Sequence, residues 1–456
     1  MEVPTIQTLN QRAATLNAQG RFDEALEVLE QAVAQEPADA TLRNNLATVL
    51  DRLGKNERAL SEYREALRLD PSCWAAHLGI ANALVRQGDY PGAEDRFQAA
   101  LQLRPTFVPA LLSMYELAQV RGDRTAALEY QERALQQQRL YSTIAPQERR
   151  RVLALLRPGD WQANIPVDLL FNAETTTLHK FYIIDRQIVP PEDLPPYDVV
   201  FNCIGESDEA GPALMAAKAF IASQKKPVLN DPDSVLRTGR LQLQQYLEYV
   251  DANVPRTKRV ARGDLVRRPL PLDFPFIIRP VGSHAGRSLS KIESDEELKT
   301  YLAGEKAGEF FVSDFVDYAR SDGFYRKYRI VMIDGQPFPF HLGISANWMI
   351  HYYNAPMREH EWMRAEERQF LASFDEVFNV KQRAVLQDIA RALGLQYFAI
   401  DCSIDKDGRL VIFEADPAVI VHVIDPVELF AYKHEHVPRI FAAVEAMVDK
   451  RIAGPR

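Results

Sequence analysis

Cysteine is scarce in this sequence. Only three of the 456 residues are cysteines, Cys73, Cys203 and Cys402, and they lie far apart in the chain. Their spacing matches no metal-binding pattern. We therefore expect buried free thiols in a protein of a reducing compartment.

A long apolar segment is also lacking. The chain contains no run of about 18 apolar residues, the length that a membrane-spanning helix needs. The first residues, MEVPTIQTLNQR, contain no apolar signal core. These absences predict a cytoplasmic protein that has no membrane partner.

An excess of positive charge is the third absence. The chain holds 54 basic and 63 acidic residues, a net charge of −9. Residues 1–141 hold 15 basic and 19 acidic residues, and the remainder holds 39 and 44. Neither part is basic, which argues against nucleic acid as the main partner.

The first 141 residues repeat themselves every 34 residues. The repeated positions include Gly20, Gly54, Gly88 and Gly122, together with Ala25, Ala59, Ala93 and Ala127. Each unit predicts two helices joined at the glycine, where the chain must turn through a left-handed conformation. Alanine stands where two helices cross closely. The pattern resembles the tetratricopeptide repeat (TPR), in four units over residues 6–141.

Stacked units of this kind form an all-α solenoid with a concave groove. We expect the groove of this TPR array (1–141) to dock a peptide or protein partner, with Asn44, Asn45, Asn82 and Arg86 among its lining residues. A rigid spacer or a dimerisation element is the alternative.

The segment 142–160 follows the array. Its apolar residues 152, 153, 155 and 156 predict a capping helix, which Pro158-Gly159-Asp160 would end before a linker. Beyond it, the apolar runs 167–171, 180–184 and 198–204 predict strands.

Residues 212–223 have helical spacing, and strands that alternate with helices indicate a small parallel α/β domain at 161–257. The turn 202–206 follows a strand, where such sheets bind ligands, although a plain turn is equally consistent. A helix is predicted at 236–250, with Arg237 and Arg240 solvated on its surface.

The stretch FPFIIRPVGSHAGRSLSKI, residues 274–292, predicts a strand, a flexible loop and a second strand. Glycine allows a backbone to approach an anion closely, and successive amide groups can bind phosphate oxygens. Arg279 and Arg287 add positive charge on either side. Such a loop alone is more often an ordinary turn, so its interpretation depends on the residues that follow.

Two further hairpins follow, and the second ends in acidic residues. Apolar runs at 309–315, 328–333 and 338–342 predict strands, as do 398–401 and 410–413 around the turn 405–408. In the last hairpin Asp401 and Glu414 can lie opposite each other, and Asp416 projects to the same face as Glu414. Opposed like charges are destabilising, and a Mg²⁺ ion would remove that cost. Strand-end charges in solvent are the alternative.

Residues 341–357, HLGISANWMIHYYNAPM, are rich in polar and aromatic side chains. We expect a substrate pocket with contacts from His341, Asn347, His351 and Tyr352. One histidine would accept a proton from an incoming amine. A packed aromatic loop with satisfied histidines is the alternative.

The segments IIRPVGSHAG, YRIVMIDGQ and FAIDCSIDKDGRLVIFEAD resemble, in order and spacing, the ATP-grasp fold. The nearest branch contains ribosomal-protein glutamate ligases and bacterial glutathione synthetase, and the resemblance covers roughly residues 165–450. It implies an α+β or α/β ATP-grasp module at 258–456, preceded by the small parallel domain at 161–257. ATP and Mg²⁺ are the implied cofactors.

The resemblance also implies roles by position. The metal ligands would be Asp401, Glu414 and Asp416; the phosphate-binding residues would be Arg240, Arg279, Gly282, Ser283, His284 and Gly286; the adenine-binding linker would include Asp314, Phe315 and Val316. Arg329 would lie near the reacting groups. Apart from the resemblance, we expect His351 of the polar segment to be catalytic and His422 to contact the substrate.

The implied activity is a carboxylate–amine ligase that forms an acyl phosphate from a small-molecule or peptide carboxylate. Three features differ from the family pattern. Arg240 and Arg279 stand where lysine is usual, Asp416 stands where asparagine is usual, and residues 417–422 replace a small glycine-containing loop. These differences keep a non-catalytic nucleotide-binding adaptor open, and a kinase on the same fold is a third possibility.

Overall fold

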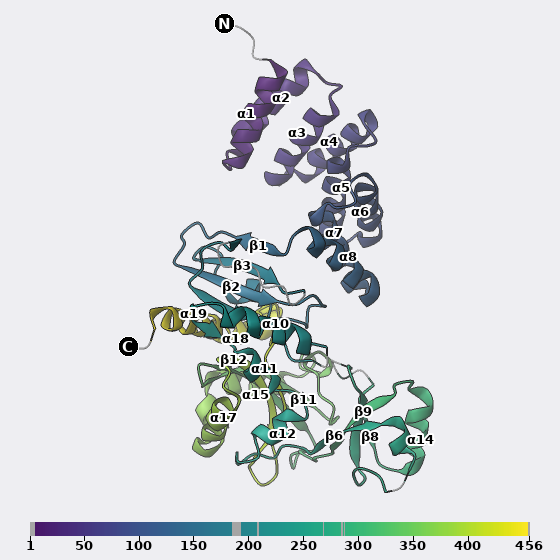
Figure 1. Cartoon of the computed structure of the whole chain (residues 1–456), viewed down its shortest axis with the longest axis vertical. Coiled ribbons are helices and arrows are strands. Elements are labelled where there is room, and N and C mark those ends of the chain that lie inside the picture. The colour runs from purple at the N-terminus through teal and green to yellow at the C-terminus, as the bar shows by residue number, and fades with distance from the viewer. Residues whose placement is uncertain are drawn as a thin grey trace. The chain divides into compact units, whose positions relative to one another are not determined.

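The computed structural model describes residues 5–184, 193–207, 209–267, 269–283, 286 and 288–454. The chain forms two compact units, Met1–Arg139 and Leu140–Arg456. Figure 1 colours the first unit purple to blue and the second from teal to yellow.

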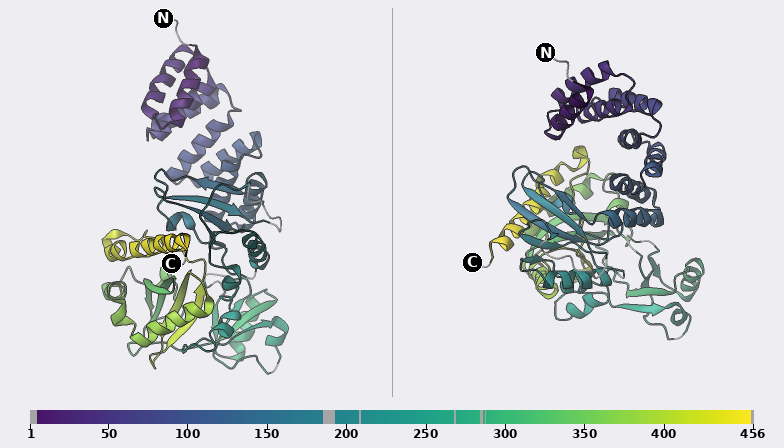
Figure 2. Two further views of the ribbon diagram at one scale, coloured as in Figure 1. Left: turned by 60° about the vertical axis from the view of Figure 1, so that its left-hand side comes forward. Right: turned by 45° about the horizontal axis from the view of Figure 1, so that its top comes forward.

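The first unit consists of helices packed in consecutive pairs, which Figure 2 shows from two further sides. They are α1 (Ile6–Ala18), α2 (Phe22–Gln35), α3 (Ala40–Arg52), α4 (Asn56–Leu69), α5 (Trp74–Gln87), α6 (Tyr90–Leu103), α7 (Val108–Arg121) and α8 (Arg124–Gln137). The four repeated glycines take the left-handed conformation at the turn within each pair. Ala25 and Ala93 have no exposed surface. This agrees with the prediction that alanine stands where two helices cross closely. The predicted repeat solenoid is confirmed.

The second unit begins with a five-stranded sheet in the order β1-β3-β2-β4-β5. Its strands are β1 (Leu140–Thr143), β2 (Arg150–Leu156), β3 (Thr176–Tyr182), β4 (Val199–Asn202) and β5 (Val228–Leu229). Strands β3, β2, β4 and β5 run parallel, and β1 is antiparallel to β3. Helix α10 (Gly211–Ala222) joins β4 to β5. This is the predicted parallel sheet.

The predicted capping helix at 142–160 is wrong, because β1 and β2 occupy that segment. Strand β2 lies between β3 and β4, and its residues 152–156 are buried on both faces. Such a strand is continuously apolar rather than alternating, so periodicity alone cannot distinguish it from a buried helix. The first unit therefore ends at Arg139.

The predicted strand at 167–171 is also wrong, since Val167–Leu170 form the single helical turn α9. Ile165 donates its backbone N–H to the carbonyl of Cys203, with an N···O distance of 2.7 Å, and so pairs with the chain just beyond the end of β4. Pro166 follows and has no N–H to continue the pairing, so the chain leaves the sheet and turns.

A four-stranded antiparallel sheet comes next, in the order β6-β9-β7-β8. Its strands are β6 (Thr257–Ala261), β7 (Phe276–Pro280), β8 (Ser290–Ile292) and β9 (Glu309–Asp314). Helices α13 (Arg262–Leu265) and α14 (Asp295–Gly304) accompany it. Phe276, Ile278 and Phe310 have no exposed surface and form its core. The strands predicted around the glycine-rich loop are confirmed.

The third sheet is antiparallel in the order β11-β10-β12-β13. Its strands are β10 (Tyr325–Ile333), β11 (Gln336–Ser345), β12 (Tyr397–Ile404) and β13 (Leu410–Asp416). The helical elements that follow or surround it are η2 (Tyr352–Asn354), α15 (Glu361–Ala372), α16 (Phe374–Val377), α17 (Val380–Leu393), α18 (Val427–His436) and α19 (Pro438–Ala453). Helices α15 and α17 pack against β11, and both predicted hairpins are present.

The predicted helix at 236–250 is instead two short helices, α11 (Pro232–Leu236) and α12 (Gln242–Tyr246). Between them Arg237 donates from Nη1 to the carbonyls of Ala392 (3.3 Å) and Leu393 (3.2 Å). It therefore caps the C-terminus of α17, where a cation is favourable. The expectation that Arg237 is only solvated is wrong.

Asn230 joins the first sheet to the third. It follows β5 with φ 54°, and its side chain donates to the carbonyl of Tyr397 at 2.7 Å. Its Oδ1 accepts from the backbone N–H groups of Gln396 (3.0 Å) and Tyr397 (2.9 Å). The start of β12 is thus fixed against the parallel sheet.

Two further expectations were buried free thiols and the absence of a membrane-spanning helix. Cys203 and Cys402 are buried and free, and Cys73 is free and half-buried. Within the described ranges, no helix combines the length and the apolar character needed to cross a bilayer.

Candidate functional site

Three neighbouring strands bring charged residues into one row. Strands β12 and β13 pair with Asp401 opposite Glu414 and Ala399 opposite Asp416. Strand β10 pairs with β12 and places Arg329 opposite Asp401. The predicted opposition of Asp401 and Glu414 is therefore present, and alternation along β13 gives Asp416 the same face as Glu414.

Two cations bind Asp401, whose relative exposure is only 2%. Arg329 donates from Nε to Oδ1 at 2.7 Å and from Nη2 to Oδ2 at 3.0 Å. Lys327 places its Nζ 2.6 Å from Oδ2. Burial acts to raise the pKa of Asp401, but Arg329 and Lys327 together hold it below its usual value.

Lys327 is a site residue that the sequence analysis missed. It lies on β10 two residues before Arg329, so strand alternation places both side chains on one face. The stretch Tyr325–Arg329 holds three cations within four positions. Once Arg329 is assigned to the site, this alternation alone would have identified Lys327.

Glu414 and Asp416 have different surroundings. Glu414 lies 3.7 Å from the Nη2 of Arg240, measured from its Oε2, and its side chain is 42% exposed. Burial and the neighbouring carboxylate of Glu414 raise the pKa of Asp416 to about 6 against the opposing charge of Arg329. Asp416 also accepts the backbone N–H of Ala418 at 2.9 Å. The predicted Arg240 thus lies beside Glu414. Together, Asp401, Glu414 and Asp416 form the acidic row.

The glycine-rich loop contacts the turn that carries His351. A Cβ built on Gly286 would lie 2.8 Å from Nε2 of His351, and Gly286 also has φ 70°, so glycine is required there. Burial lowers the pKa of His351, and the nearby charge of Lys327 lowers it further. The structure therefore brings Gly286, His351 and the cations of β10 together.

Arg279 is tied to the base of the same loop. It donates from Nε to Oγ of Ser283 at 3.0 Å and from Nη2 to the carbonyl of Ser283. Gly282 has φ 77° and provides the turn between them. His284 and Arg287 lie outside the described residues. Phosphate binding by this loop stays a prediction.

The predicted adenine linker follows β9. Asp314 donates its backbone N–H to the carbonyl of Arg256 at 3.0 Å, and its carboxylate binds the Arg256 side chain. The ring of Phe315 lies 5.8 Å from that of Trp348, and Nζ of Lys291 lies 4.2 Å from the Phe315 centroid. The adenine contact of 314–316, including Val316, stays a prediction.

His341 lies in a second charged group, the Lys433 cluster, which comprises Lys433, Glu367, Asp425, His341 and Tyr352. Lys433 is 1% exposed, and its Nζ lies 3.3 Å from Oε1 of Glu367 and 3.2 Å from Oδ2 of Asp425. Nδ1 of His341 lies 3.2 Å from Nζ, and the ring of Tyr352 stacks on that of His341 at 4.2 Å.

The side chains of this cluster are packed against one another. This agrees with the alternative of a packed aromatic loop. Burial lowers the pKa of His341 well below its usual value, and the charge of Lys433 lowers it further. His422 lies beside it, with ring centroids 5.9 Å apart. Asn347 is exposed on the loop after β11. Substrate contacts by these residues stay predictions.

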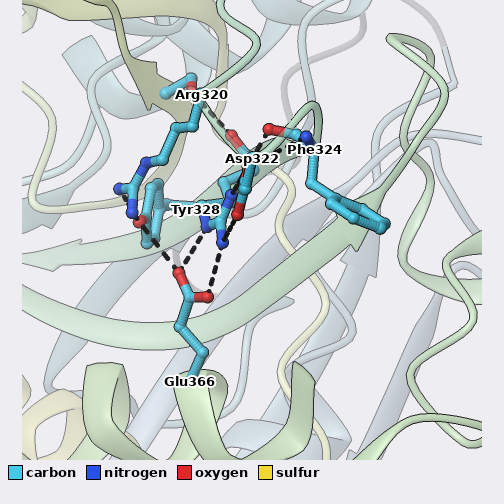
Figure 3. A network of polar contacts seen from close by, with 7 residues as sticks. Arg320, Asp322, Phe324, Tyr328 and Glu366 are labelled. Carbon is cyan, nitrogen blue, oxygen red and sulfur yellow. Dashed lines mark hydrogen bonds and ion pairs between the residues drawn. The ribbon is translucent and has the colours of Figure 1, made fainter. Parts of the chain in front are cut away.

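The opposite face of β10 carries a network that holds the strand in place (Figure 3). Arg326 donates from Nε and Nη2 to Glu366 on α15, at 2.5 and 2.9 Å, and from Nη2 to Asp322 at 2.8 Å. Arg320 donates to the hydroxyl of Tyr328 at 2.8 Å, as Figure 3 shows. Because alternate side chains point to opposite faces, this anchoring directs Lys327 and Arg329 to the acidic row.

The acidic row suits a metal ion in kind. Three carboxylates are the oxygen ligands that Mg²⁺ prefers, and burial, together with the charge of Glu414, raises the pKa of Asp416. Within the described residues, however, no three His, Cys, Asp or Glu side chains are arranged to hold a metal. Asp401 instead binds Arg329 and Lys327, so a metal would have to share it with them.

Comparison with family models supports the repeat array. Residues 4–72 and 44–106 each match a model described as tetratricopeptide repeat. This agrees with the predicted resemblance of the first unit. A comparison with curated proteins found no match.

Two kinds of solved structure are among those similar to this chain. A thermophilic TPR protein from Thermus thermophilus is 23% identical with TM-score 0.28, covering 29% of this chain and 75% of its own. D-alanine–D-alanine ligase from Bacillus anthracis, complexed with ATP, is 11% identical with TM-score 0.43, covering 67% and 100%. A RimK-domain ATP-grasp protein from Sphaerobacter thermophilus is 15% identical with TM-score 0.39, covering 66% and 100%.

Proposed function

We propose that this protein is an ATP- and Mg²⁺-dependent ligase of the ATP-grasp type, and that its TPR array docks a peptide or protein. The observation that supports this best is the row of Arg329, Asp401 and Glu414 across three strands. The charges of these three residues reach His351, which contacts the glycine-rich loop at Gly286. Cations, carboxylates and a glycine-rich loop are the groups that phosphoryl transfer needs.

In the proposed reaction a substrate carboxylate oxygen attacks the γ-phosphorus of ATP, and ADP leaves. An amine then attacks the acyl phosphate, and phosphate leaves as the amide bond forms. Asp401, Glu414 and Asp416 would hold Mg²⁺, which supplies charge neutralisation on the phosphate oxygens when bound. Arg329 would stabilise charge on the transferring group and orient it.

His351 is the proposed proton acceptor from the amine. A base must be unprotonated before it can accept a proton, and burial together with Lys327 lowers the pKa of His351. The imidazole is therefore neutral near pH 7. Its Nε2 faces Gly286 of the loop that would cover the phosphates.

The proposal is tested by ADP release from the full chain across a panel of carboxylates and amines. Hydroxylamine should convert an acyl phosphate to a hydroxamate. Asp401→Asn and Glu414→Gln should abolish turnover, whereas Asp407→Asn, in the exposed turn of the same hairpin, should not. Full activity in both site variants would refute the assignment.

A non-catalytic nucleotide-binding adaptor is the second candidate. It is favoured by the ion pairs that Lys327 and Arg329 make with Asp401. Calorimetry that finds ATP binding without ADP release in any substrate mixture would support it. ADP release without hydroxamate would favour a kinase instead.

The TPR array is the proposed docking site for a peptide or protein. Asn45 donates to Oδ1 of Asn10 at 2.9 Å and so links α3 to α1, and Arg86 pairs with Asp51. Side-chain amides can bind the backbone of an extended peptide through both donor and acceptor. On a peptide array, Asn45→Ala should weaken binding of the full chain, while the exposed control Glu27→Ala should not.

A further inference from the structure

The number of cations on Asp401 exceeds what one carboxylate needs. Arg329 already binds both carboxylate oxygens, a two-pronged arrangement that satisfies the charge. Lys327 adds a second positive charge 2.6 Å from Oδ2. Glu414 has Arg240 as its ion-pair partner at 3.7 Å, although the charges of Lys327 and Arg329 also reach it.

The position of Lys327 allows it to change partners. Its side chain is 23% exposed, whereas that of Asp401 is 2% exposed. A lysine is a compact charge on a flexible stem, so one ammonium can move between nearby anions. Lys327 also lies close enough to His351 to lower its pKa, and His351 contacts Gly286 of the glycine-rich loop. The ammonium therefore lies beside Asp401, and its charge reaches a histidine that contacts that loop.

We propose that Lys327 is a polyphosphate-binding residue that occupies Asp401 until a nucleotide arrives. This rests on the proposed function of the same site. On nucleotide binding the ammonium moves from Oδ2 of Asp401 to a phosphate oxygen. Oδ2 of Asp401 is then free to bind a metal ion. Lys327 thus opposes a divalent cation that arrives alone and favours the nucleotide that accompanies it.

This assignment differs from a purely structural role in the signs that it predicts. If Lys327 only neutralised a buried carboxylate, its removal would disturb the site and weaken both ligands. If it exchanges between Asp401 and phosphate, its removal weakens the nucleotide and strengthens the metal. The two ligands should therefore respond in opposite directions.

The test measures two affinities separately, with Mn²⁺ as the metal probe. In Lys327→Met, binding of Mn²⁺ alone, followed by electron paramagnetic resonance, should tighten by about tenfold, the scale of one charge-assisted hydrogen bond. Binding of ATP in EDTA, followed by calorimetry, should weaken by about tenfold. Lys327→Arg keeps the charge and should preserve ATP binding and weak Mn²⁺ binding.

Lys180→Met is the matched control. Lys180 pairs with Asp168 at 2.8 Å and is 25% exposed, close to the values for Lys327, but it lies in β3 of the parallel sheet. Neither affinity should change in this variant. Thermal unfolding of all variants checks that each is folded, and Lys327→Gln replaces Lys327→Met if the latter is not.

The outcomes separate this inference from the proposed function. Unchanged or weaker Mn²⁺ binding in Lys327→Met overturns the inference, even if the wild-type chain turns over ATP. Unchanged ATP affinity overturns it as well. A wild-type chain that does not bind ATP overturns the proposed function and, with it, the nucleotide role of Lys327.

Discussion

The charged residues on the two faces of β10 are shared in opposite ways. On the face toward α15, Arg326 serves two carboxylates, Glu366 and Asp322, and its side chain is 6% exposed. On the other face, Lys327 and Arg329 share the single carboxylate of Asp401. Arg326 is thus shared between two carboxylates, whereas Asp401 is shared between two cations.

This difference indicates what each face can do. The carboxylates around Arg326 raise its pKa although burial opposes them, and they join β10 to α15 and to the turn before the strand. Such a closed network stabilises one arrangement. Two cations on one carboxylate, close to a histidine that contacts the glycine-rich loop, are instead suited to an anion from outside.

Removal of Arg329 should affect activity far more than stability. In Arg329→Met, turnover should fall by about 100- to 1,000-fold, the usual loss when one donor to a developing charge is removed. The free energy of unfolding should change by about 1 kcal/mol or less, because Lys327 still neutralises Asp401. Steady-state kinetics and urea unfolding measure the two effects. A stability loss as large as that of Arg326→Met would contradict the different roles of the two faces.

Removal of Arg326 should have the reverse effect. In Arg326→Met, Glu366 and Asp322 lose the cation that they share. The free energy of unfolding should fall by about 2–3 kcal/mol. This is below the value for a fully buried pair, because both carboxylates are partly exposed and Arg320 stays 3.6 Å from Glu366. Nucleotide affinity at low temperature should stay unchanged. Adding Glu366→Gln should recover part of the loss, and failure to recover any would contradict the network as drawn.

The sequence predicted the pairing of Asp401 with Glu414 but none of the contacts on the opposite face of β10. The spacing of a hairpin was enough to place Asp401 opposite Glu414, because strand pairing is local and the turn 405–408 sets the register. The partners of Arg326 come from a preceding turn and from α15, 40 residues away along the chain. No local pattern marks such a contact.

The failures at 142–156 and at Arg237 have related causes. A strand buried on both faces loses the alternation by which strands are identified, and β2 acquires its neighbours β3 and β4 only from later in the chain. Arg237 is assigned by the end of α17, more than 150 residues on. In each case the deciding partner is distant in sequence, whereas the repeats and hairpins that were predicted correctly are defined by nearby residues.

The Lys433 cluster extends the contrast to pH. Because the pKa of His341 is lowered in the folded chain, the unfolded chain binds more protons below about pH 6.5, the ordinary pKa. The contribution of neutral His341 is therefore present above that pH and lost as the pH falls. Between pH 7 and 5 the wild type should lose about 1–2 kcal/mol that His341→Gln does not lose. If urea unfolding of the wild type and of His341→Gln depended on pH in the same way, His341 would not titrate as expected.

The smallest effect is expected at Arg240, which sharpens the contrast most. Its pair with Glu414 is long, at 3.7 Å, and both side chains are well exposed, at 30% and 42%. Such a pair contributes about 0.5 kcal/mol or less, so Arg240→Gln should leave urea unfolding unchanged. If Arg240 holds phosphate, the same variant should still weaken ATP binding measurably by calorimetry. A charge that contributes nothing to folding but is needed for the nucleotide belongs to the ligand, and loss of stability without loss of affinity would place Arg240 with Arg326 instead.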